Sequence, residues 1–147
     1  MILTLLVACC PAALADSLPG VDNAERARTN YILKCQGCHG PNAEGSHIAQ
    51  VPRMQGFAGN FLRVPGGREF MVQVPGTATA ALSDPALAEL LNWLLPTISK
   101  VEMPADFAPY STEEVARLRQ SPAIDVGERR AALIDALGMQ GITEPDS

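Results

Sequence analysis

Several residue types and patterns are scarce in this chain, and each absence weakens one class of function. The sequence holds four cysteines and two histidines. Two of the cysteines and one histidine lie together at residues 35–39. A zinc site would need a second Cys/His pair, and only Cys9, Cys10 and a lone His47 remain for it. No catalytic triad, phosphate-binding loop or carboxylate cluster is present, and no βαβ pattern surrounds the cysteines. The net charge of −5 argues against nucleic acid as a partner.

Long apolar runs are missing after the first fifteen residues. Residues 1–15 are almost wholly apolar and end in Ala-Leu-Ala, which predicts a cleaved export signal and a mature chain that begins at Asp16. The signal has no Lys or Arg, and residues 6–9 (Leu-Val-Ala-Cys) also fit a lipoprotein box, so a lipid anchor through Cys9 is the alternative. No later run approaches the roughly 20 residues that a transmembrane helix needs. We therefore expect no transmembrane segment.

The stretch that carries chemistry is Cys-Gln-Gly-Cys-His at residues 35–39. Two thiols three residues apart, followed at once by an imidazole, are the attachment pattern of c-type haem. On one helical turn, Cys35 and Cys38 face the same side, where their sulfurs can add to the two vinyl groups of one haem. His39 then lies under the iron, and imidazole is a strong iron ligand. A reactive thiol pair and a zinc site are the alternatives without iron chemistry.

The pattern around this motif predicts a helix. Asp22 with Glu25 forms a capping-box signal, and apolar residues follow at spacings of three and four up to Cys38. Gly40 and Pro41 then end the helix. This spacing places Tyr31 on the face that carries the haem motif.

Three later helices are also predicted, each from a cap signal. The first runs from Asp84 to Pro96 with a leucine stripe, and Trp93 lies off that stripe. The other two begin at Ser111 and Asp125, each with a glutamate three residues on. Between the haem motif and the leucine-rich helix, residues 64–76 contain Val-Pro-Gly twice, which predicts two turns around an extended segment.

Residues 35–56 resemble the class I c-type cytochromes. They begin Cys-Gln-Gly-Cys-His-Gly-Pro-Asn-Ala-Glu-Gly and end Val-Pro-Arg-Met-Gln-Gly, which looks like the P-x-L-x-G loop of that family. The resemblance implies an all-α fold with three to four helices around one covalent haem and an irregular loop in the middle. It also implies that the Pro52 carbonyl accepts a hydrogen bond from His39, that Tyr31 packs against a later helix, and that the protein matures in a periplasm. Arg63 and Arg68 are candidate partners of the haem propionates.

The sixth ligand of the iron has three candidates. Met103, followed by proline and then by a Ser-capped helix, has the arrangement usual in class I and ranks first. If the helix with Trp93 is instead the terminal helix of the family, the methionine should lie upstream, as Met71 does. His47 ranks third because it follows the haem motif so closely. We therefore expect His39 and Met103 to bind the iron.

These expectations describe one haem domain over residues 16–138 with a flexible tail at 139–147. A haem iron with two protein ligands carries one electron and binds no substrate. The first hypothesis is thus a periplasmic electron carrier, or the cytochrome subunit of a dehydrogenase, that passes electrons from a dehydrogenase to an oxidase or another cytochrome. The alternative is an enzyme or sensor whose five-coordinate haem binds peroxide or a diatomic gas.

Overall fold

The computed structural model describes residues 18–145, and this part of the chain is all-α, which confirms the predicted fold class. The predicted export signal and Cys9 lie outside the described residues. The elements in chain order are α1 (Ala24–Lys34), α2 (Gln36–His39), the 3-10 helix η1 (Ala58–Arg63), α3 (Gly67–Gln73), α4 (Pro75–Ala78), α5 (Asp84–Ile98), α6 (Thr112–Leu118) and α7 (Val126–Gly138). No described helix has both the length and the apolar character needed to cross a bilayer.

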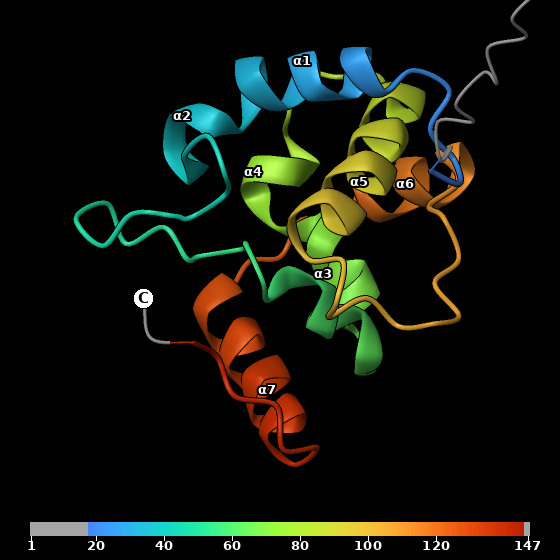
Figure 1. The fold of residues 1–147 in the computed structure, drawn as a ribbon. Helices are drawn as coiled ribbons and strands as arrows, with labels where there is room; N and C mark the ends of the chain where they lie inside the picture. The colour runs from blue at the N-terminus through green and yellow to red at the C-terminus, as the bar shows by residue number, and fades with distance from the viewer. Residues whose placement is uncertain (1–17, 146–147) are drawn as a thin grey trace, which may run out of the picture.

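The fold is built on the pairing of α1 with α5, which cross in the upper part of Figure 1. The buried face of α1 consists of Ala27 and Tyr31, and the leucine stripe of α5 is buried beside it. The Tyr31 and Trp93 rings lie 6.2 Å apart at 52°. Tyr31 therefore packs against a later helix, and Trp93 covers α1.

A buried carboxylate fastens the start of α1 to α5. Glu89 on α5 is 5% exposed and accepts hydrogen bonds from the backbone N–H groups of Asp22 (3.1 Å) and Asn23 (2.9 Å). Arg26 adds two more through Nε and Nη2, each at 2.7 Å. Because the first N–H groups of a helix lack intrahelical partners, Glu89 stabilises α1 from a neighbouring helix.

Several predicted helix boundaries differ from the structure. The first helix is broken at Cys35 into α1 and α2, and its N-cap is Asn23, whose side chain accepts from the Arg26 N–H. Helix α5 continues through Pro96 to Ile98, because a proline in the last turn removes only one intrahelical bond. Ser111 caps α6 as predicted, by accepting from the Glu114 N–H.

The middle segment was predicted as an extended stretch in an irregular loop, and this was wrong. Residues 67–73 form α3 and residues 75–78 form α4. Three consecutive residues, Phe70, Met71 and Val72, are buried, which a helix wedged between neighbours allows and a half-exposed strand does not. The number of helices consequently exceeds the predicted three to four.

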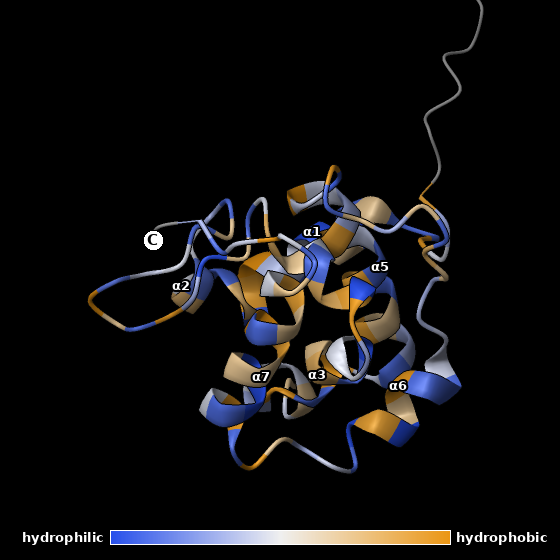
Figure 2. Cartoon of the chain, turned by 90° about the horizontal axis from the view of Figure 1, so that it is seen from below, coloured by the Kyte–Doolittle hydropathy of each residue, from blue (hydrophilic) through white to orange (hydrophobic). Residues whose placement is uncertain are grey.

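The C-terminal helices complete the core. Val115 and Leu118 of α6 and Leu133 and Leu137 of α7 are buried in the same apolar cluster as α3 and α5. Figure 2 shows hydrophobic residues gathered in the middle of the molecule, between α1, α3 and α5. Residues 139–145 return along α7, where the Ile142 N–H bonds the Leu137 carbonyl. A flexible tail at 139–147 stays a prediction.

Candidate functional site

The haem motif forms a short helix of its own at the end of α1. Cys35 ends α1 and precedes α2, and the N–H groups of Cys38 and His39 both donate to the Cys35 carbonyl (3.2 and 3.0 Å). This single turn keeps the two cysteines on one helical turn, as the spacing predicts. Both thiols are free, and Cys38 is exposed while Cys35 is half-buried. Helix α2 packs against α1 and buries none of its own residues.

The surroundings of the His39 imidazole favour its neutral form. Burial lowers the pKa of His39, and the neutral ring is the form that can bind a metal ion. Its Nδ1 is buried without a hydrogen-bond partner, which is uncommon for a polar atom that water cannot reach. Burial also raises the pKa of the Cys35 thiol, with the nearby Cys38 as a second cause. Two free thiols and a neutral imidazole on one turn fit a covalently attached haem.

The segment after the motif supports His39 through its backbone. The Gly45 N–H donates to the His39 carbonyl (2.9 Å), and the Tyr31 hydroxyl donates to the Gly40 carbonyl (2.6 Å). Gly45 has φ +76°, and a Cβ there would lie 2.5 Å from the Val51 carbonyl oxygen. Glycine is therefore required where this loop folds back on itself. Sequence reasoning missed Gly45, although its place at the end of a turn could have indicated it.

Pro52 does not make the contact that the resemblance implies. It is exposed, and since His39 Nδ1 has no partner, no hydrogen bond joins the Pro52 carbonyl to the imidazole in this structure. The Ser46–Val51 bridge instead closes the loop just before Pro52. The role of Pro52 as a positioning group for His39 stays a prediction.

The two arginines proposed for the propionates have partners within the protein. Arg68 forms a two-bonded pair with Glu114 (2.6 and 2.7 Å) and lies 4.0 Å from the centre of the Tyr110 ring. The Glu114 bond raises the pKa of Arg68 most strongly. Arg63 donates to the backbone carbonyls of residues 102 and 103 (2.9 and 3.1 Å). Both side chains thus join α3 or η1 to later segments.

The candidate sixth ligands lie in three different surroundings. Met103 is half-buried in the turn after α5, Met71 is 8% exposed in the core, and His47 is exposed in the loop that follows the haem motif. Among the described residues, no three His, Cys, Asp or Glu side chains gather into a metal-binding cluster.

Two curated proteins are similar to this chain. Both are named cytochrome c-552 and come from Thermus thermophilus. One is 27% identical over 120 residues, covering 69% of this chain and 80% of the relative. The other is 28% identical over 104 residues, covering 58% of this chain and 79% of the relative. No protein-family profile matches the chain, and no solved structure matches it.

Proposed function

This chain is a distant homologue of the c-type cytochromes, and from that premise we propose that it is a periplasmic one-electron carrier with a single covalent haem c. The homology supports a haem c protein that works with redox partners. We further propose that the chain carries one haem, attached at Cys35 and Cys38, and that it works in a periplasm. The one observation that supports it most is the free Cys35 and Cys38 pair beside a half-buried His39 whose Nδ1 has no hydrogen-bond partner.

Each residue of the motif has a distinct task. Cys35 and Cys38 would hold the haem through thioether bonds, which keep such a ring in place in both oxidation states. His39 would bind the iron through one ring nitrogen. Its Nδ1 is left to donate a hydrogen bond, and such a bond orients a metal-bound imidazole and raises its basicity. Met103 as the second axial ligand stays a prediction.

The haem supplies the electron-transfer chemistry, and the protein supplies a fixed surrounding. Tyr31 and Trp93 hold α1, and with it the motif, against α5. The donor we propose is a dehydrogenase, and the acceptor is an oxidase or another cytochrome. An export signal over residues 1–15 would deliver the chain to the compartment where c-type haem is attached.

Expression in a bacterial host that attaches haem c in its periplasm tests this proposal. We expect the wild-type protein to keep its haem after denaturation and acid extraction, and to titrate reversibly with a one-electron slope. His39→Ala should lose the wild-type absorption spectrum, and the matched variant His47→Ala should keep it. A purified wild-type protein without covalent haem, or with haem that does not cycle, would overturn the proposal.

A further inference from the structure

Helices α1 and α5 border a cleft near the place where they cross. The cleft has a volume of about 440 Å³ and lies between α1, the turn after α2 and the second half of α5. Clefts that bind small molecules measure roughly 300–1,000 Å³. Cys35, Cys38 and His39 do not line it, so the side chains proposed to hold the haem form no part of its wall.

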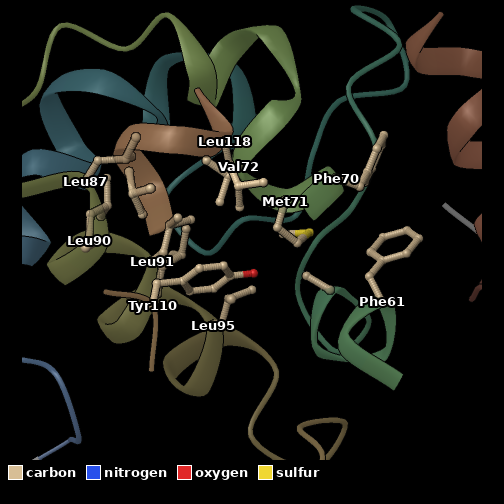
Figure 3. Packing of buried hydrophobic residues seen from close by; sticks show 14 of the residues in the cluster. Phe61, Phe70, Met71, Val72, Leu87, Leu90, Leu91, Leu95, Tyr110 and Leu118 are labelled. Carbon is tan, nitrogen blue, oxygen red and sulfur yellow. The ribbon is translucent and has the colours of Figure 1, made fainter. Parts of the chain in front are cut away.

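The residues of α5 that line the cleft differ from those that fill the core. Figure 3 shows Leu91 and Leu95 of α5 beside Tyr110 in the apolar cluster. Trp93 and Thr97 lie one turn apart on another side of the helix and line the cleft, where Trp93 is half-buried and Thr97 is exposed. A substitution at Thr97 therefore changes the cleft and leaves the packing of the core alone.

The apolar part of the lining combines an aromatic ring with a branched side chain. Trp93, the only tryptophan of the chain, packs against the Tyr31 ring at 6.2 Å and keeps part of its surface exposed. Ile32 on α1 is 40% exposed although it is a large apolar residue. Aromatic rings pair in offset or tilted arrangements, and a flat ligand can therefore pack on Trp93. This part of the lining favours a planar aromatic group.

The polar part of the lining carries a positive charge. Arg28 is the only charged side chain among the described residues that line the cleft. It is exposed, and within residues 18–145 its guanidinium forms no ion pair. A guanidinium binds a carboxylate through two parallel hydrogen bonds. The charge of the cleft thus matches an anionic ligand.

Two other clefts of the protein show the opposite arrangement. The cleft of about 500 Å³ beside the start of α5 contains Arg26 together with Glu89, to which it is bonded. The cleft of about 250 Å³ beside the loop after the haem motif contains Arg130 and its partner Glu144. In both, the fold itself supplies the carboxylate. At Arg28, a carboxylate from outside the chain can take that place.

We propose that the cleft between α1 and α5 binds a small aromatic carboxylate, with its ring against Trp93 and Ile32 and its carboxylate on Arg28. Such a ligand bridges the two helices whose pairing holds the haem motif in place. This inference goes beyond the proposed function and does not depend on the haem, because the side chains that bind the ligand belong to the folded chain itself.

The probe is 2-naphthoate, and its control is 2-naphthamide, which keeps the rings and lacks the charge. The purified, ¹⁵N-labelled protein is kept reduced and titrated with each compound by NMR at pH 7 and low salt. We expect 2-naphthoate to bind with a dissociation constant of about 1 mM or lower and to shift the amide signals of residues 28–36 and 93–98. The amide should bind about tenfold more weakly, because hydrogen bonds to a charged acceptor are the stronger ones.

Two pairs of variants test the charge. Arg28→Gln should weaken 2-naphthoate binding about tenfold and leave 2-naphthamide binding unchanged. Its matched control is Lys34→Gln, an exposed cation of the same helix that does not line the cleft, and this variant should change neither. Thr97→Glu places a carboxylate in the cleft and should also weaken 2-naphthoate binding, whereas the uncharged Thr97→Gln should keep most of it. Spectra of the free variants check their fold.

Several results would overturn the inference. These are no binding of 2-naphthoate up to about 10 mM, tenfold above the expected constant, equal binding by wild type and Arg28→Gln, or shifts that lie outside the two stretches. Shifts of the same residues that depend on protein concentration without any ligand would also overturn it, because a second copy of the chain would then cover the cleft. A protein that binds 2-naphthoate as expected but carries no covalent haem supports this inference and overturns the proposed function.

Discussion

Replacing Glu89 by glutamine should destabilise the protein by about 2–3 kcal/mol, because hydrogen bonds to a charged acceptor contribute roughly 1.5–3 kcal/mol each and the amide keeps only part of them. The buried carboxylate accepts four hydrogen bonds, two from the backbone at the start of α1 and two from Arg26. The amide oxygen of the substituted side chain can still accept one or two, but its NH₂ group faces donors. The variant therefore weakens the attachment of α1 to α5.

Urea unfolding at pH 7 measures this loss, with Glu25→Gln as the matched control because Glu25 is an exposed residue of the same first turn. The Arg26 hydrogen bond holds the pKa of Glu89 below its usual value. A lowered folded-state pKa gives stability that is complete above the unfolded value, about 4.3, and is lost as the pH falls through the folded value. The gap between wild type and Glu89→Gln should therefore close below about pH 4. A difference in unfolding free energy under about 0.5 kcal/mol at pH 7, which is typical of a surface substitution, would refute this role of Glu89.

Three further substitutions, the first with a matched control, test contacts that hold the helices together. Gly67→Ala should destabilise by about 3 kcal/mol or more, since its Cβ would lie 1.8 Å from the Phe61 carbonyl oxygen, whereas Gly76→Ala, with no atom within 4 Å, should be nearly neutral in the same unfolding assay. Asn92→Ala should cost about 2–4 kcal/mol, because the buried Tyr110 N–H and carbonyl lose their partners; calorimetry showing no loss would contradict this. Arg119→Lys should speed amide hydrogen exchange in residues 78–84, because an ammonium cannot replace the guanidinium fork, and unchanged exchange would show that the segment is held otherwise.

The sequence predicted best where one local rule decided the outcome. The haem motif, the Ser111 cap and the leucine stripe of the helix at residues 84–98 each depend on neighbours within a turn or two, and the structure contains the Ser111 cap and the stripe in the predicted places. The pairing of Tyr31 with a later helix followed from the spacing and the family resemblance.

The errors fall where distant contacts override local pattern. Residues 64–76 alternate like a strand, but Gly67 lets α3 approach the Phe61 carbonyl closely and bury one side. Arg68 looked free for a propionate until the fold brought Glu114 within 2.6 Å, from 46 residues away. Glu89 has no local signal as a helix cap, because the helix that it caps lies more than 60 residues earlier.

The intact mass of the exported, denatured protein measures whether Cys35 and Cys38 carry one covalent haem. We expect the mass of a chain beginning at Asp16 plus one haem for the wild type, and the mass of the chain alone for the double variant Cys35→Ala, Cys38→Ala. A wild-type mass without haem, from cells that attach haem to a known c-type cytochrome expressed in parallel, would show that the motif does not carry a haem.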